Sequence, residues 1–177
     1  MRTRASLAIL CLAWLGASLA APTTARDKGW LAFFTGDTCQ MGRSVDDISM
    51  PGSGIAIAIL RRPFDKLPPA AGQTMLSVLV IDGGTPLNKA NDSIVIIAGL
   101  KNWKLTSAEH DGLGMNYLSG AAADEVRSSF LAEDVTVQVG QPNGSSQTYA
   151  VNPKGFAVAN ATFNACVTAL SREKPRQ

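Results

Sequence analysis

The stretch that decides the fold is GFAVANATFNACVTAL, residues 155–170, near the end of the chain. Its apolar residues recur at spacings of three and four, which predicts a helix with one apolar face. That face consists of Phe156, Ala159, Phe163, Cys166 and Leu170. Asn152-Pro153 is typical of a helix start, and the polar, proline-containing end of the chain predicts that the helix stops near Arg172. Cys166 is therefore expected on the side of the helix that packs against the rest of the protein.

The first 20 residues have the pattern of a secretory signal peptide. Arg2 and Arg4 precede an apolar segment at 7–15, and Ser18-Leu19-Ala20 has small residues at the two cleavage positions. We expect cleavage after Ala20 and export to the periplasm or the exterior of a bacterial cell. An uncleaved membrane anchor is the alternative, which the short apolar segment disfavours. No later segment has the length and hydropathy of a transmembrane helix, so no membrane span is expected in the mature chain.

The cysteines predict a single disulfide. Cys11 lies in the leader, which leaves Cys39 and Cys166 and only one possible pairing in an oxidising compartment. This bond would join the region of the first strand to the last helix, and closing so long a loop is worth about 5 kcal/mol. The alternative is a reactive thiol. Cys166 is poorly placed for that role, because the dipole late in a helix disfavours a thiolate.

Between the two cysteines, strands come first and a helix follows. Alternating or wholly apolar segments predict strands, and a segment with early acidic residues and a repeat of four predicts a helix. The predicted strands are 30–34, 54–62, 74–81, 93–98, 101–107 and 114–118; a helix from Ser119 to Glu133 follows, and then a hairpin of 135–139 and 147–151 around Asn143-Gly144. Segment 74–81 is almost wholly apolar, so we expect it to be a central strand.

The order of these elements predicts the fold class. Strands that are clustered rather than alternating with helices indicate an α+β domain, mainly antiparallel sheet or sandwich-like. It would have two helices in its C-terminal third and one disulfide. We expect a single domain over 28–171 and a polar tail at 172–177.

The charge of the chain argues against nucleic acid as a partner. The sequence has 16 Lys and Arg and 14 Asp and Glu residues, and the two counts become equal once Arg2 and Arg4 leave with the leader. A protein that binds nucleic acid normally presents a basic patch to the phosphates. No such patch is visible in the sequence.

Catalytic residues are not predicted. The only histidine is His110, in the run Glu109-His110-Asp111, and transition-metal sites usually draw on several His or Cys ligands. A nucleophile triad would have to use this same histidine. We interpret the run as a solvated loop, and we expect no catalytic residue, no metal and no cofactor. The alternative is a small hydrolase or a thiol enzyme that uses His110.

Two segments are candidates for binding. Trp103 lies between Lys101 and Lys104 and is the aromatic residue we expect to act as an exposed anchor, since interfaces favour Trp with nearby cations. Trp30 and Tyr149, by contrast, are expected in the core. The second segment is the polar loop 82–92, whose oxygen-bearing side chains include Asp82, Asn88 and Asp92. Its spacing departs from the EF-hand pattern, so we predict a polar loop, with a calcium site as the alternative.

The order of elements resembles that of a group of small exported bacterial proteins. The residues that carry the resemblance are Trp30 and Cys39, Phe130-Leu131 before VTVQV, the segment YAVNPKGF, and the alanine-rich helix up to Cys166. With these features the chain is similar to the invasion-associated locus B family. The resemblance implies a β-rich periplasmic or surface protein with a role in host association or in the envelope, and it implies no catalytic residues.

These observations together favour a non-catalytic exported protein that binds another macromolecule, most simply another protein. It would act as an envelope accessory, an inhibitor or a host-interaction factor. A structural component of the envelope is a further alternative, which self-assembly of the protein would reveal.

Overall fold

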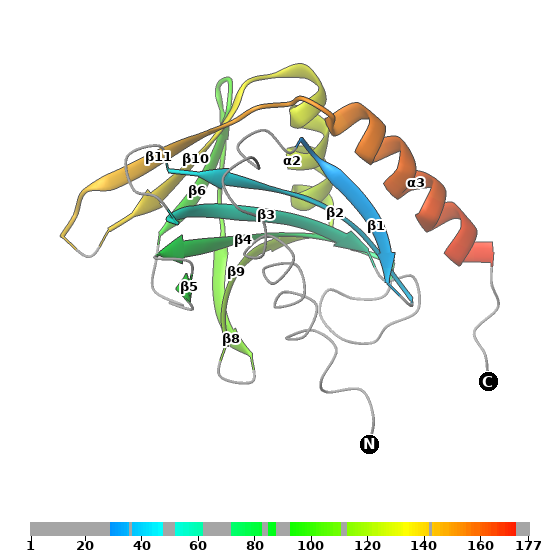
Figure 1. Cartoon of the computed structure of the whole chain (residues 1–177), viewed down its shortest axis with the longest axis horizontal. Helices are drawn as coiled ribbons and strands as arrows, with labels where there is room; N and C mark the ends of the chain where they lie inside the picture. Colours follow the sequence, from blue (N-terminus) through cyan, green and yellow to red (C-terminus); the bar gives the residue numbers. More distant parts are fainter. Residues whose placement is uncertain are drawn as a thin grey trace.

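The computed structural model describes residues 29–35, 37–47, 52–61, 72–82, 85–87, 93–110, 113–141 and 143–172. Within these ranges the chain forms two antiparallel sheets and two helices, which confirms the expected α+β class (Figure 1). The strands are β1 (Leu31–Thr35), β2 (Thr38–Asp46), β3 (Gly54–Arg61), β4 (Thr74–Asp82), β5 (Thr85–Leu87), β6 (Ile94–Ala98), β7 (Lys101–Lys104), β8 (Thr106–His110), β9 (Leu113–Ser119), β10 (Val135–Gly140) and β11 (Ser146–Val151). The helices are α2 (Ala121–Ala132) and α3 (Phe156–Arg172).

The larger sheet has the strand order β1-β2-β3-β4-β9-β8, with β5 paired to the end of β4. Its register confirms the predicted alternation in β3, because Ile55, Ile57 and Ile59 share one face and are all fully buried. They lie opposite the buried apolar residues of β4. The strand β4 is central, as its apolar sequence predicts.

The smaller sheet has the order β11-β10-β6-β7, and it is joined to the larger sheet at a corner. Strands β7 and β8 follow one another with only Leu105 between them, yet they belong to different sheets. Leu105 is buried, and its backbone N–H donates to the carbonyl of Ile94 over 2.9 Å. Figure 1 shows the result, in which β6 runs steeply across the strands of the larger sheet. The single strand predicted over 101–107 is therefore two strands.

The two helices cover one side of the larger sheet and meet at an aromatic cluster. Helix α2 packs against β4, β9 and β6, and helix α3 packs against β1 and β2. Between them lies Trp30, whose ring is 4.8 Å from the ring of Phe130 on α2 and 4.8 Å from that of Phe156 on α3. Edge-to-face pairs at this distance contribute beyond their buried area. Trp30 and Tyr149 are both buried, as the sequence predicts.

The disulfide joins β2 to α3, between Cys39 and Cys166, residues 127 apart in the sequence. Cys39 is fully buried. The predicted apolar face of α3 is confirmed as well, because Phe156, Ala159, Phe163 and Leu170 are the buried residues of the helix. The helix also ends at Arg172, as predicted.

Both helices begin later than predicted. Ser119 cannot cap α2, because it is the last residue of β9 and pairs with Met75; the cap position is Gly120, at φ +61°. The helix is held instead from outside, since the Thr74 hydroxyl donates to Asp124 in its first turn over 2.7 Å. Before α3, Gly155 has φ +81°, a left-handed conformation that a helix cannot contain, so the helix begins at Phe156.

Two strands had no counterpart among the predicted elements. Strand β2 carries Cys39 and lies between β1 and β3, although its sequence alternates too weakly to reveal it. Strand β5 corrects the prediction that 82–92 is a polar loop, because Thr85–Leu87 within it is a strand. It forms because β9 pairs only with Met75–Val78 of β4, which leaves the end of β4 with an open edge for Thr85–Leu87.

Candidate binding surface

The turn between β6 and β7 presents the most exposed large hydrophobic side chain among the described residues. Gly99 takes φ +55° in this turn, and a Cβ atom at Gly99 would collide with Oε2 of Glu133 at the end of α2. Leu100 follows and is fully exposed, at 104%. The turn thus lies beside the end of α2, with Leu100 projecting from it.

The first residues of β7 are fixed against α2 by one carboxylate. The Lys101 ammonium contacts Glu125 Oε1 at 2.7 Å, and the Trp103 indole N–H donates to Glu125 Oε2 over 3.2 Å. Both side chains lie on the same side of β7, since they are two residues apart. We call Leu100, Lys101, Trp103, Glu125 and Glu133 the tip surface.

Trp103 forms the floor of the tip surface. It lies opposite the buried Ile96 in the strand register, and its ring is half-buried and packs against the core. The prediction that Trp103 is an exposed anchor therefore needs correction, because only part of the ring is open to a partner. Its role in binding stays a prediction.

The electrostatics of this contact follow from the shared carboxylate. Hydrogen bonding and charge from Glu125 raise the pKa of Lys101, with a smaller contribution from Glu133. The hydrogen bonds from Lys101 and Trp103 lower the pKa of Glu125. The Lys101 and Glu125 side chains are 58% and 48% exposed, so solvent screens their attraction. The contact therefore orients side chains more than it stabilises the fold.

The structure separates the other residues predicted for binding. Lys104 pairs with Val95 on the opposite side of β7 from Trp103. Asp82 ends β4 in the other sheet, where it accepts a hydrogen bond from the Ser53 hydroxyl over 3.1 Å. Asn88 and Asp92 lie outside the described residues. The predicted set is therefore not a single site.

Leu100 and Glu125 belong to the surface but were not predicted from the sequence. The exposure of Leu100 could have been predicted from local sequence. An apolar residue directly after a turn glycine lies outside the alternating buried positions of the two flanking strands. Nothing in the sequence indicates that Glu125 contacts β7, because it is an ordinary acidic residue of a helix that is distant from β7 in the sequence.

The interpretation of Glu109-His110 as a solvated loop is corrected by the strand register. Both residues belong to β8, with Glu109 opposite Gly114 and His110 opposite Leu113. The hairpin of β8 and β9 extends this far because β9 begins as early as Leu113. Asp111 lies outside the described residues.

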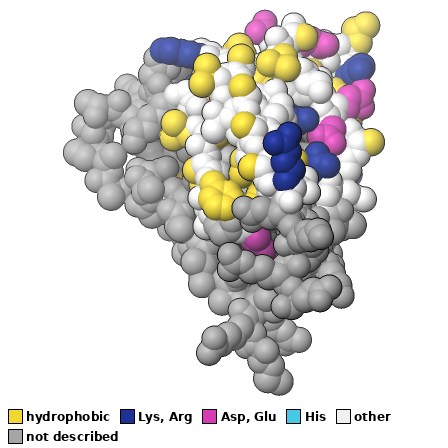
Figure 2. Space-filling model, turned by 90° about the vertical axis from the view of Figure 1, so that its right-hand side faces the viewer, with side chains coloured by type: hydrophobic (Ala, Val, Ile, Leu, Met, Phe, Trp, Pro, Cys, Tyr) yellow, Lys and Arg dark blue, Asp and Glu magenta, His cyan; other side chains and the backbone are white. Residues whose placement is uncertain are grey.

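On the face of the molecule that α3 covers, no described hydrophobic side chain is as exposed as Leu100. Figure 2 shows this face with hydrophobic side chains in small separate groups, while charged side chains gather mainly toward one side of it. Val158 of α3 is 73% exposed and Leu131 of α2 is 57% exposed. Hydrophobic residues scattered singly over a surface need no functional explanation.

In the ranges that the structure describes, no group of three or more His, Cys, Asp or Glu side chains is arranged to hold a metal ion. None of the helices in these ranges is both long and apolar enough to cross a membrane.

The chain was compared with known proteins by sequence and by structure. No protein-family model, no curated protein and no solved structure matches it.

Proposed function

We propose that the mature chain is an exported, non-catalytic protein that binds another protein through the tip surface. The observation that carries the proposal is Leu100, a fully exposed aliphatic side chain three residues before the half-buried Trp103. An apolar side chain held in water loses little on entering a partner's pocket and gains the free energy of burial, about 2 kcal/mol for a leucine.

The surroundings of Leu100 suit it to this role. Glu125 holds both Lys101 and Trp103, so the neighbouring side chains are ordered before a partner arrives. Binding then costs less side-chain entropy than it would at a mobile surface. Trp with flanking charges is typical of the centre and rim of protein interfaces.

Export is part of the proposal and rests on two observations. The leader has the pattern of a signal peptide, and the Cys39–Cys166 disulfide is a bond that persists in oxidising compartments. The periplasm or the exterior of the cell follows as the proposed location. The resemblance to the invasion-associated locus B proteins supports a role in the envelope or in host association.

Of the two enzyme alternatives, the thiol enzyme has less support than the hydrolase. The disulfide occupies both cysteines of the described residues, so a thiol enzyme has no nucleophile there. A hydroxyl-based hydrolase would still need His110, and its test is His110→Ala in the folded protein.

The proposal is tested with a photo-crosslinking residue placed at position 100 of the exported protein in its own cells. The matched control is position 146, where Ser146 is exposed at one end of β11. We expect one discrete adduct from position 100 and none from 146. Excess wild-type protein should abolish the adduct, and the variant Leu100→Asp should not compete.

Other outcomes have distinct meanings. Equal adducts from both positions, or none from position 100, would contradict the tip surface as the binding site. An adduct of twice the monomer mass would identify the partner as a second copy and favour the structural-component alternative.

A further inference from the structure

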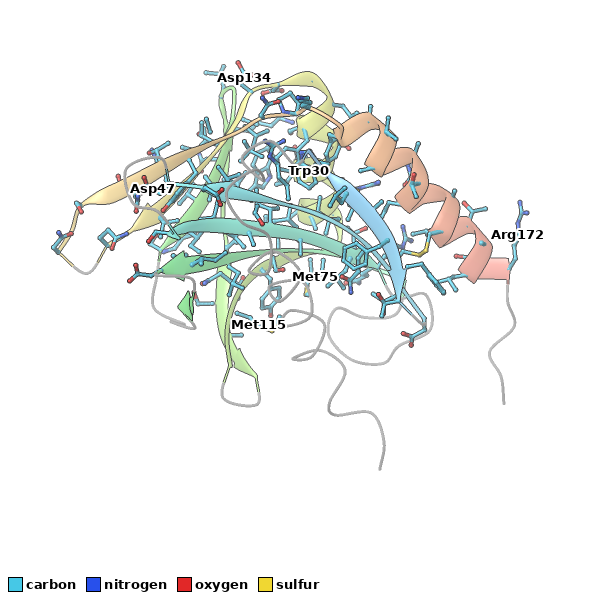
Figure 3. The ribbon with its side chains drawn as sticks, viewed as in Figure 1. Trp30, Asp47, Met75, Met115, Asp134 and Arg172 are labelled. Atoms are coloured by element: carbon cyan, nitrogen blue, oxygen red, sulfur yellow. A yellow bond between two sulfur atoms is a disulfide. The ribbon has the colours of Figure 1, made fainter. Side chains whose placement is uncertain are left out.

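The turn of the β10–β11 hairpin is an exposed segment that the proposed function does not use. In Figure 3 the end of this hairpin lies on the opposite side of the molecule from α3. Asn143, Gly144 and Ser145 are all exposed there. The Asn143-Gly144 pair, which predicts the hairpin, is also prone to loss of the asparagine amide, because a glycine has no side chain to shield its backbone nitrogen.

Ser145 holds the side chain of Asn143 in place. Its backbone N–H donates to Asn143 Oδ1 over 3.0 Å, and its hydroxyl donates to the same oxygen over 2.7 Å. A bond from this oxygen to the N–H two residues further on is an Asx turn. It closes a ring that contains the Gly144 nitrogen, so the carboxamide carbon of Asn143, Cγ, is held on the side where that nitrogen lies.

The same two hydrogen bonds polarise the Asn143 amide. Both donors contact the oxygen on which negative charge develops when a nucleophile adds to Cγ, as donors do in an oxyanion hole. The nucleophile is the Gly144 nitrogen. Gly144 takes φ +82°, and a Cβ atom there would meet no described residue within 4 Å beyond its chain neighbours. Its N–H donates to the Gln141 carbonyl over 2.9 Å, and water can replace this bond because Gly144 is exposed.

We propose that Asn143 undergoes spontaneous deamidation in the folded protein and that Ser145 promotes it. The Gly144 nitrogen loses its proton and attacks Cγ, an N–Cγ bond forms, and the Cγ–Nδ2 bond breaks. Ammonia leaves with that proton, and a succinimide ring remains. Water then opens the ring at either carbonyl, which gives aspartate when the original backbone bond is kept and isoaspartate when it is broken. Nothing is oxidised or reduced, and water is the only co-reactant.

The product changes the charge of the hairpin. Segment 135–151 contains no Lys, Arg, Asp or Glu, so the new carboxylate is its first charged side chain. Isoaspartate also adds a methylene group to the main chain within the turn. The hairpin therefore becomes acidic as the protein ages. This change is separate from the tip surface, so it does not depend on the proposed function.

Asn152 is a natural control for the role of glycine. Its Oδ1 accepts a hydrogen bond from the Lys154 N–H over 2.8 Å, which is the same arrangement as at Asn143. The residue between them is Pro153, which has no backbone N–H and cannot form the succinimide. Asn152 is exposed as well, so a difference between the two asparagines does not come from burial.

The test follows the folded, oxidised protein over time at mildly alkaline pH, with peptide mapping by mass spectrometry. We expect the peptide that contains Asn143 to gain the mass of an amide-to-acid conversion, as a mixture of aspartate and isoaspartate. The peptide that contains Asn152 should stay unchanged. Of these two peptides, an isoaspartate-specific methyltransferase should label only the first.

The contribution of the turn geometry is tested with two serine variants. Ser145→Ala removes the hydroxyl that donates to Asn143, and we expect it to slow the conversion several-fold. Ser146→Ala removes the neighbouring exposed hydroxyl and is the control, so its rate should equal that of the wild type. In urea with reductant, where the turn is lost, the wild type and Ser145→Ala should convert at the same rate.

Either of two results would overturn the proposal. One is a folded wild-type protein whose Asn143 peptide stays as unchanged as its Asn152 peptide over a period in which the urea-unfolded chain converts. The other is an equal rate for Ser145→Ala and Ser146→Ala in the folded protein, which would show that the sequence of the turn, and not its structure, sets the rate.

Discussion

At the scale of single residues, the packing in this protein follows helical periodicity closely. Phe130 and Leu131 are neighbours on α2, yet Phe130 is 1% exposed and Leu131 is 57% exposed. The repeat of Val126 and Phe130 every four residues predicts the difference, because positions four apart share a helix face. Phe130 also packs against the rings of both Trp30 and Phe156.

These neighbours provide a matched pair for stability. We expect Phe130→Ala to lower the free energy of unfolding by about 3–5 kcal/mol, since it leaves a cavity in the aromatic cluster. Leu131→Ala should change it by less than about 0.5 kcal/mol, because the side chain is largely in water. Urea unfolding of the oxidised protein measures both, and equal losses in the two variants would refute the packing described for α2.

The contact of Glu125 with Trp103 gives a prediction about pH. Hydrogen bonds from Lys101 and Trp103 lower the pKa of Glu125, so the contact persists above the ordinary value of 4.5 and is lost as pH falls through the lower folded value. We expect the Trp103 indole N–H resonance in NMR to shift with a midpoint below 4.5. In Glu125→Gln this transition should vanish. A midpoint at or above 4.5 would mean that the hydrogen bond does not form in solution.

At the scale of elements, one arginine joins the two helices. Arg127 of α2 donates from Nη1 to Asn160 at 2.8 Å and to Asn164 at 3.0 Å, both on α3. Its guanidinium also lies 5.5 Å from the centre of the Phe163 ring. Asn160 and Asn164 are one turn apart, so the helical spacing of α3 presents both amides to the same guanidinium.

We expect Arg127→Ala to lower the free energy of unfolding by about 1.5–3 kcal/mol, the range for hydrogen bonds to a charged group. Arg127→Lys should recover little of this loss, because an ammonium cannot reproduce the planar fork. Arg172→Ala, at the exposed end of α3, is the control and should change stability by less than about 0.5 kcal/mol. Recovery by lysine to the wild-type value would show that charge alone matters at Arg127.

Local sequence could not predict which of the two sheets a strand joins. Segment 101–107 alternates like one strand, and nothing in it shows that Leu105 marks a change of sheet. The change is decided by the partners, since β6 pairs with β7 and β9 pairs with β8. Strand β2 was likewise missed because its pairing with β1 and β3, rather than its own pattern, holds it extended.

At the scale of the whole molecule, the disulfide connects the first strands to the last helix. Reduction opens a closed loop of 127 residues, which in the chain-entropy model costs about 5 kcal/mol. We expect the urea midpoint to fall strongly when reductant is present, and the double variant Cys39→Ser, Cys166→Ser to fall equally. The intact mass of the exported protein should show no alkylation until reduction. Alkylation without reductant would mean that the thiols are free.

The candidate binding residues were likewise predictable only where local sequence identifies them. The sequence pointed to Lys101 and Trp103 from their own composition, and the structure added Leu100 and Glu125, which only folding places beside them. Lys104 was grouped with them because it is adjacent in sequence, but strand geometry directs it to the other side. Asp82 was also predicted for binding, but its hydrogen-bond partner Ser53, just before β3, is 29 residues away in the sequence.

The sequence by itself determined the features that depend on neighbours along the chain. These are the helical faces, the alternation in β3, the buried Trp30 and Tyr149, and the disulfide, for which only one pairing was open. The tertiary structure alone decided where helices start, which sheet a strand joins, and which polar groups meet at Glu125. The reason is physical: periodicity is set by local backbone geometry, whereas strand pairing and side-chain contacts depend on segments that are distant in sequence.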